Sequence, residues 1–311
     1  MKKWQKFLVF AVAFGVLLTV SFGITGMIAF GESYIEIDSG EELRKIGLDP
    51  AYPLDGDYRL TADIDLSDAD WYGIGYDPVA DNEYQFTGSF DGQGHVIKGM
   101  HCGAPGAPTR VFECWGLICW TTSPVTVKNI IFEDVYLNVN ENKFGYGCAG
   151  VVLGWAGGSA TVTIENVAVL SGSLYMDVRQ SRIGGILGCN GSSGGVTIKN
   201  CFNAADVTGA ASGSNYYVAA GGIVGNAESK NLTMTQCVNV GKIASLSGTA
   251  GGVSTVVSHI GGTISSGTVP GAFASGTSVS DCYSMAGATS TADGGYLCTA
   301  EADGVTLRPA G

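Results

Sequence analysis

The sequence predicts an all-β protein, a parallel β-solenoid. Five segments of similar sequence recur in the chain, and within them apolar and β-branched residues alternate with polar ones. Alternation of this kind is typical of strands with one buried face, and a repeat of a few tens of residues is typical of solenoids, propellers and arrays. Each repeat is therefore expected to form one coil that pairs with the next coil.

Two elements make up each repeat. The first element reads VTVKNI (125–130), VTIENV (162–167), VTIKNC (196–201), LTMTQC (232–237) and TSVSDC (277–282). The second element follows at a variable distance and reads AGVVLG (149–154), GGILG (184–188), GGIVG (221–225), GGVST (251–255) and, more weakly, GGYL (294–297). Asparagine and glycine between these runs suit sharp corners, because both tolerate the left-handed backbone conformation.

Equivalent positions of stacked coils form columns. Cys201, Cys237 and Cys282 share a column with Ile130 and Val167. This composition favours an inward-facing apolar column in which cysteine acts as a small hydrophobic residue. A disulfide between neighbouring coils is the alternative, since the spacing of paired strands brings their Cα atoms within reach.

An adjacent column contains Asn129, Asn166 and Asn200. Stacked asparagine side chains can hydrogen-bond to one another along a ladder. We expect a structural role for this column, with ligand contact as the alternative.

The first 31 residues read as a signal peptide or membrane anchor. A basic start is followed by an uncharged apolar run over residues 7–30, with Ala29 and Gly31 placed for cleavage before Glu32. The run is also long enough to cross a bilayer, and either alternative predicts an extracellular or cell-surface location for the rest of the chain. Residues 32–124 are expected to form an opening section with a short helix at 41–48, and residues 125–311 the repeats.

The exported part of the chain is acidic. The formal charge is −12, and it becomes −15 for residues 32–311 because Lys2, Lys3 and Lys6 are removed with the leader. A uniform acidic excess argues against nucleic acid or anionic lipid as a partner, so membrane contact is expected only through an uncleaved N-terminal segment. The nine cysteines are an odd number, so one would remain unpaired in a full disulfide framework.

The repeats resemble a known family. GGILG, GGIVG and NCFNAADVTG, preceded by WYGIGYDP and FTGSFDGQGHVIKGM, are similar to the GLUG-motif repeats of bacterial cell-surface proteins. The resemblance covers roughly residues 34–298 and implies a right-handed parallel β-helix. Such repeats also accompany IgA-protease-type metallopeptidases, whose zinc signature is HExxH. None of His95, His101 and His259 belongs to that signature, so only the non-catalytic part of those proteins is matched.

The segment DIDLSDADW (63–71) is the densest acidic cluster. Asp63 and Asp65 lie two apart on an expected strand and hence on one face, and Asp68 and Asp70 follow in the next turn. Such oxygen ligands could hold Ca²⁺, but the glycine and the final glutamate of an EF-hand loop are missing. A solvated face with carboxylates that cap turns is the preferred interpretation.

Carboxylate pairs could also cleave polysaccharides. The candidate pairs are Asp91 with Glu83 and Asp63 with Asp65. In FTGSFDGQGHVIKG (86–99), Asp91 and His95 look like a catalytic pair. The glycines between them favour a corner, at which Asp91 accepts hydrogen bonds from backbone amides and His95 begins the next strand in a packing role.

Aromatic residues provide the remaining candidates. In CWGLICW (114–120), Trp115 and Trp120 would stack on a sugar if they were exposed, but core packing is the preferred interpretation. The loops AASGSNYYVAA (210–220) and EYQF (83–86) are expected to expose aromatic side chains.

The sequence assigns no catalytic, cofactor-binding or metal-binding residue and no cofactor. The predicted function is an adhesin-like module that is exported and binds glycans or host or community proteins through the outer face of a β-helix. A polysaccharide-active enzyme and a passive structural spacer are the alternatives.

Overall fold

The computed structural model describes residues 34–111, 113–142, 145–211, 217–228, 231–247, 254–258, 278–280, 282–284, 288–290, 296–300 and 307–309. These residues belong to one compact unit, Tyr34–Gly311. The predicted signal peptide or anchor, residues 1–31, lies outside the described residues. Within the described ranges, no helix is both long enough and apolar enough to cross a membrane.

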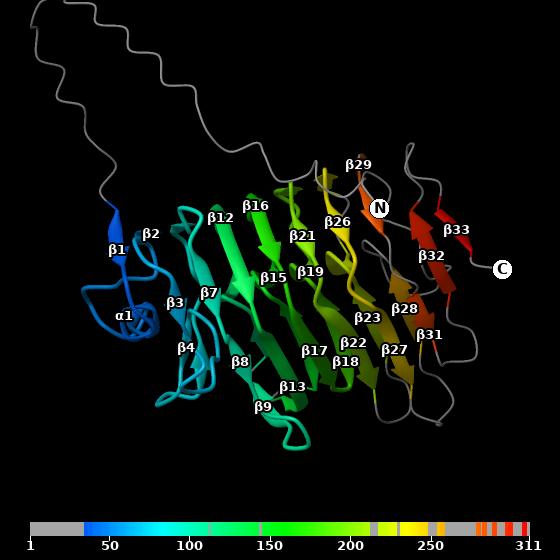
Figure 1. The fold of residues 1–311 in the computed structure, drawn as a ribbon, viewed down its shortest axis with the longest axis horizontal. Coiled ribbons are helices and arrows are strands. Elements are labelled where there is room, and N and C mark those ends of the chain that lie inside the picture. Colours follow the sequence, from blue (N-terminus) through cyan, green and yellow to red (C-terminus); the bar gives the residue numbers. More distant parts are fainter. Residues whose placement is uncertain are drawn as a thin grey trace, which may run out of the picture. The chain divides into compact units, whose positions relative to one another are not determined.

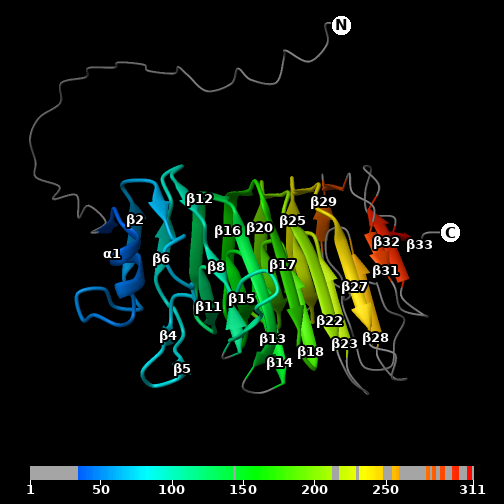
Figure 2. The same cartoon turned by 60° about the horizontal axis from the view of Figure 1, so that its bottom comes forward.

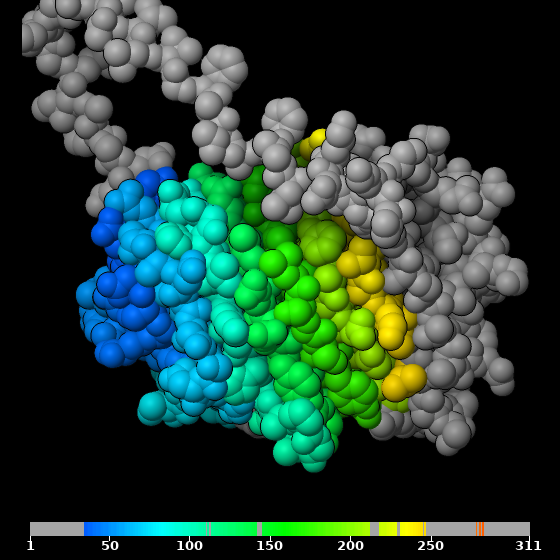
Figure 3. Space-filling model, in the orientation of Figure 1, coloured from blue at the N-terminus to red at the C-terminus, as the bar shows by residue number. Residues whose placement is uncertain are grey.

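The predicted parallel β-solenoid is confirmed (Figures 1 and 2). One full coil contains β12 (Val125–Glu133), β13 (Val135–Asn142), β14 (Tyr146–Gly150) and β15 (Leu153–Ala156). Each of these strands pairs in parallel with the equivalent strand of the next coil, β16 to β19. The coils therefore stack one on another, and the space-filling view shows them as successive bands of colour (Figure 3).

In the described part of the chain, four sheets run along the stack. Sheet 1 contains β1 (Ile35–Ile37), β2 (Asp57–Leu60), β6 (Ser89–Asp91), β12, β16 (Val162–Val169), β20 (Val196–Lys199), β25 (Leu232–Thr235) and β29 (Ser278–Ser280), with β3 (Ile64–Asp65), β7 (Val96–Lys98), β21 (Phe202–Asn203), β26 (Val238–Asn239) and β30 (Tyr283–Ser284) alongside. Sheet 2 contains β8 (His101–Cys102), β9 (Thr109–Val111), β13, β17 (Gly172–Asp177), β22 (Asp206–Ala211), β27 (Ile243–Ser247) and β31 (Ala288–Ser290).

Sheet 3 contains β10 (Cys114–Trp115), β14, β18 (Gln180–Gly184), β23 (Tyr217–Gly221), β28 (Ser254–Ser258), β32 (Tyr296–Ala300) and β33 (Leu307–Pro309), and its last pair is antiparallel. Sheet 4 contains β11 (Ile118–Thr121), β15, β19 (Leu187–Asn190) and β24 (Val224–Ala227). A short hairpin, β4 (Tyr76–Asp77) and β5 (Asn82–Glu83), lies outside these four sheets.

The first repeated element has the predicted register. Val125 lies beside Val162, then Val196, then Leu232, and Thr233 lies beside Ser278. The Cα pairings on either side of it place Cys201, Cys237 and Cys282 in one column with Ile130 and Val167, as expected. All five side chains are at most 5% exposed, so the column is part of the core, and none of the three cysteines is in a disulfide in the structure.

The second repeated element is only partly as predicted. Gly150, Gly184 and Gly221 are paired with one another, and a Cβ on Gly184 or Gly221 would collide with a carbonyl oxygen three residues further on. The prediction that GGVST (251–255) and GGYL (294–297) are the fourth and fifth members of this element is wrong. Ser258 lies beside Gly221, and Cys298 lies beside Ser258. Loop length varies before this element, so similarity of letters alone does not determine its register.

The asparagine column is a hydrogen-bonded ladder. Asn166 Nδ2 donates to Asn129 Oδ1 at 3.0 Å, and Asn200 Nδ2 donates to Asn166 Oδ1 at 2.7 Å. The three residues have φ of 57°, 57° and 52°, in the left-handed region that few residues other than glycine, asparagine and aspartate tolerate. Asparagine thus forms the corner of these three consecutive coils and joins them to one another, whereas Gln236 takes the same left-handed position in the next coil.

Pairing is continuous from the opening section into the repeats, because β6 and β7 pair with β12. The predicted short helix is present as α1 (Gly40–Lys45) at the N-terminal end of the stack (Figure 1). The Ser39 hydroxyl accepts from the Glu42 amide, acidic residues occupy the first turn and basic residues the last, as the helix dipole favours. Leu43 is buried and fixes the helix to the core.

Candidate binding surface

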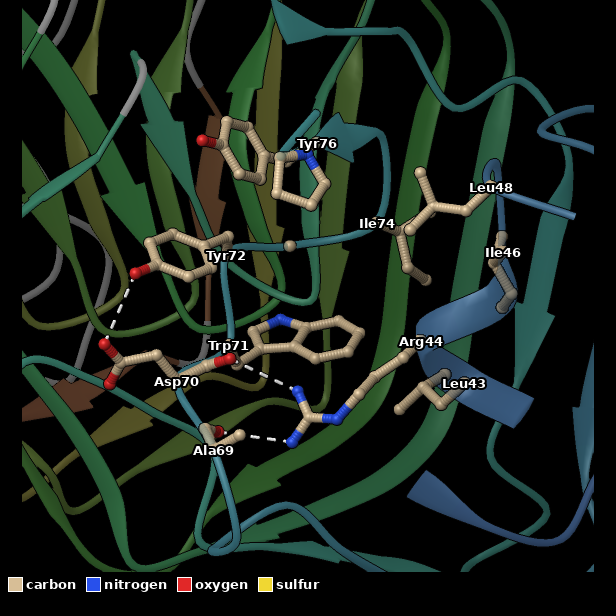
Figure 4. A pocket seen from close by; sticks show the side chains of 12 residues that line it. Leu43, Arg44, Ile46, Leu48, Ala69, Asp70, Trp71, Tyr72, Ile74 and Tyr76 are labelled. Carbon is tan, nitrogen blue, oxygen red and sulfur yellow. Dashed lines mark hydrogen bonds between the residues drawn. The ribbon is translucent and has the colours of Figure 1, made fainter. Parts of the chain in front are cut away.

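A pocket lies between residues 43–48, in and after α1, and residues 69–78, which begin in the acidic cluster (Figure 4). It encloses about 270 Å³ and its wall is mainly apolar. Its lining residues are Leu43, Arg44, Ile46, Leu48, Ala69, Asp70, Trp71, Tyr72, Gly73, Ile74, Tyr76 and Pro78. This volume is near the lower limit of ordinary small-ligand pockets, so it would take a group of about one ring.

Arg44 fixes one side of the pocket. Its guanidinium donates to the carbonyls of Ala69 and Asp70, pairs with Asp68 at 2.8 Å, and lies 5.7 Å from the centroid of the Trp71 ring. Figure 4 shows the two carbonyl contacts as dashed lines. Because each of its contacts holds the wall in place, we assign Arg44 a positioning role.

Two buried tryptophans fix the floor. Trp71 Nε1 donates to the Gly116 carbonyl at 2.9 Å, and Trp115 Nε1 donates to the Trp71 carbonyl at 2.7 Å. Both indoles are at most 3% exposed. Core packing is therefore confirmed for Trp115, and this residue cannot stack on an external ligand.

Half-buried aromatic rings continue from the pocket over the outer surface, and we call Tyr72, Tyr76, Trp120 and Trp155 the aromatic strip. The Tyr72 and Tyr76 rings lie 5.2 Å apart, and the Trp120 and Trp155 rings lie 6.0 Å apart. Tyr76, Trp120 and Trp155 all pack on one cluster of buried cysteines. The two tryptophans are Cα partners on β11 and β15, so the sheet itself sets their spacing.

Sequence reasoning identified Trp120 but missed Trp155. Trp155 lies in LGWAG, next to the second repeated element, whereas Trp120 lies in a segment interpreted as core. Only the register of β11 with β15 brings the two rings together.

The carboxylates of the acidic cluster accept hydrogen bonds from other groups of the protein. Asp63 accepts from the Val96 amide and lies 3.0 Å from His95 Nδ1, and these two hydrogen bonds lower the pKa of Asp63. Asp65 accepts from the Ser67 amide at 2.9 Å. Asp70 accepts from the Gly103 amide at 3.1 Å. Turn and strand capping thus accounts for these carboxylates, and among the described residues no group of three or more His, Cys, Asp or Glu side chains is arranged to hold a metal ion.

Asp91 and His95 do not form a pair with each other. Asp91 Oδ1 accepts from the Gln93 amide at 3.0 Å and from Asn129 Nδ2 at 2.9 Å, which is the predicted corner role. Burial opposes the charged form, but these hydrogen bonds and Lys128 lower the pKa of Asp91. Asp91 is therefore the first rung of the asparagine ladder, and the partner of His95 is Asp63.

Glu83 is buried and hydrogen-bonds to backbone amides, away from Asp91. Its carboxyl group accepts from the amides of Glu113 and Cys114, and it is 7% exposed. Desolvation raises its pKa to about 8, against the effect of the two amide donors. The proposed pairing of Glu83 with Asp91 is not a feature of the structure, since the two carboxyl groups hydrogen-bond to different strands.

The two loops expected to expose aromatic side chains give a mixed result. In EYQF (83–86), Tyr84 is 43% exposed, whereas Glu83 and Phe86 are buried. In the loop at 210–220, residues 212–216 lie outside the described residues, and the described side chains of Ala210, Ala211 and 218–220 are buried.

The comparisons with known proteins concern both the sequence and the fold. No family model matches the chain. It is 32% identical over 164 residues to Halomucin of Haloquadratum walsbyi, a match that covers 50% of this chain and spans only 2% of that protein's length. A crystal structure of a candidate immunoglobulin A1 protease from Bacteroides ovatus has a similar fold, with a TM-score of 0.53 at 17% identity over 88% of this chain and 82% of that one.

Proposed function

We propose that this protein is an exported surface module that binds glycans through the aromatic strip. The half-buried Trp120–Trp155 pair on a rigid sheet is the observation that carries the proposal. An indole presents a flat apolar face with a polar edge, and such a group can pack against the C–H face of a sugar while its neighbours contact the hydroxyls. The adjoining pocket would take one further ring of an extended glycan.

Location and ligand class have separate support. The basic and apolar leader in residues 1–31 and the match to Halomucin support export to the outside of the cell. The acidic charge of the chain supports neutral rather than acidic glycans, because like charges repel. The similarity to the Bacteroides ovatus structure supports the fold alone, at 17% identity.

The test is binding of the purified protein to a glycan array, followed by titration of each hit. Replacing Trp120 and Trp155 together by alanine is expected to weaken binding about tenfold or more, because each lost stacking contact is worth roughly 0.5–1.5 kcal/mol. Tyr84→Ala is the matched control, since Tyr84 is exposed but lies outside the strip. Silence of the wild type on the array, or a double variant that binds as well as the control, would remove the proposal.

A further inference from the structure

Four cysteines form a cluster of their own beneath the aromatic strip. Cys114, Cys119, Cys148 and Cys189 are at most 5% exposed, and they form a hydrophobic cluster distinct from the main core. We call these four residues the cysteine cluster. Nothing in the proposed glycan binding uses their thiols, so their chemistry is a separate question.

Strand register places two of them side by side. Cys114 on β10 is the Cα partner of Cys148 on β14, one coil further on. Neighbouring strands lie about 4.8 Å apart, which falls inside the Cα separation of about 4.4–6.8 Å that a disulfide spans. Cys189 reaches Cys148 from β19, on the adjoining sheet 4. Cys148 is therefore the central thiol of the cluster.

A cation lies next to the central thiol. Arg182 on β18 is the Cα partner of Cys148 on the other side, and its Nε is held 3.0 Å from Glu228 Oε1. Hydrogen bonds from Cys114 and then Cys189 lower the pKa of Cys148, and the nearby guanidinium of Arg182 adds to this effect. Burial raises the pKa of Cys114, so the two partners differ in acidity.

The carboxyl groups around the cluster act in the opposite direction. Glu83 and Glu113 raise the pKa of Cys114, and Glu228 raises the pKa of Cys189. The core column provides a contrast, because a hydrogen bond with Cys201 raises the pKa of Cys237 to about 12. The thiolate, rather than the thiol, is the nucleophile in disulfide exchange. Cys148 is thus better prepared for exchange than Cys237.

We propose that Cys148 is a redox-active thiol that forms a disulfide with Cys114 and so staples two consecutive coils. The oxidant is a low-molecular-weight disulfide. Its S–S bond breaks when the Cys148 thiolate attacks one sulfur, and one reagent thiol leaves with a proton. Cys114 then loses its proton to solvent and attacks the Cys148 sulfur of the mixed disulfide, which releases the second reagent thiol. Two electrons pass from the two cysteines to the oxidant.

The staple would join the coil that carries Trp120 to the coil that carries Trp155. It would therefore fix the spacing of the two rings covalently. The redox chemistry is independent of glycan binding, so either proposal can fail alone.

Peptide mapping of the full-length protein tests the staple. The reduced protein is incubated with glutathione and glutathione disulfide at several ratios and sampled over time until equilibrium; each sample is alkylated after unfolding and cleaved with trypsin. Cys114 and Cys119 fall in the peptide of residues 111–128, Cys148 in 144–179 and Cys189 in 183–199. We expect a link between the first two peptides, while Cys201 and Cys237 remain alkylated at ratios that oxidise the pair.

Variants separate the possible outcomes. Cys114→Ser should remove the link between the first two peptides, Cys119→Ser should leave it, and Arg182→Gln should slow its formation about tenfold. Cys201→Ser is the matched control and should form the link at the wild-type rate. Alkylation of Cys148 at every ratio would overturn the proposal, as would a link from Cys148 to the peptide with Cys189, persistence of the link in Cys114→Ser, or earlier oxidation of the Cys201 column.

Discussion

Asn166 donates a hydrogen bond from its side-chain amide to the side-chain oxygen of Asn129, 37 positions earlier in the chain and one coil away. Both residues have a φ of 57°, so the same side chain that bridges the coils also makes the left-handed corner possible. Two requirements, backbone geometry and cross-coil bonding, are met by one residue type.

The two roles of Asn166 can be separated. Asn166→Gly keeps the left-handed corner but loses the ladder, whereas Asn166→Ala loses both. The alanine variant should therefore unfold with a free energy about 1–2 kcal/mol below that of the glycine variant, because a Cβ is strained at this φ. Chemical denaturation measures the difference, and equal stabilities would show that backbone strain is not important at the corner.

Glu83 makes stability depend on pH in the direction opposite to most carboxylates. Its pKa is raised from 4.5 to about 8 in the folded state, so the folded protein binds more protons than the unfolded chain between those values. The contribution is fully present below pH 4.5 and is lost as pH rises through 8. At most about 1.4 kcal/mol is lost for each pH unit in this window.

Replacing Glu83 by glutamine removes the titrating group and keeps an oxygen acceptor for the Cys114 amide. The variant should gain stability relative to the wild type as pH rises from 5 to 9, as measured by thermal or chemical denaturation. Glu141→Gln, at an exposed side chain, is the control for the substitution itself. A difference that is flat with pH would mean that Glu83 is ionised in the folded protein.

The core column tests whether Cys237 acts as a hydrophobic residue. Isoleucine and valine occupy the equivalent positions 130 and 167, so Cys237→Val should change the free energy of unfolding by less than about 1.5 kcal/mol. Cys237→Ser places a hydroxyl in the same buried position and should cost about 1–3 kcal/mol. If serine were tolerated better than valine in denaturation experiments, the column would not be a simple apolar core.

The sequence by itself determined the parallel solenoid, the register of the first repeated element, and the core and asparagine columns. Each of these depends on a short pattern that recurs in consecutive coils, and stacking brings equivalent residues such as Asn129 and Asn166 together. The short helix α1 was also predictable, because its cap and its charges are local in the sequence.

Only the tertiary structure decided the candidate surface. Trp155 joins Trp120, and Cys148 joins Cys114, through pairings that follow loops of different length, so similarity between repeats did not reveal them. The same variable loops explain why GGVST (251–255) was placed in the wrong register. Asp63, Asp91 and Glu83 each have a hydrogen-bond partner 30 or more positions away, and the stacking of the coils brings that partner within reach.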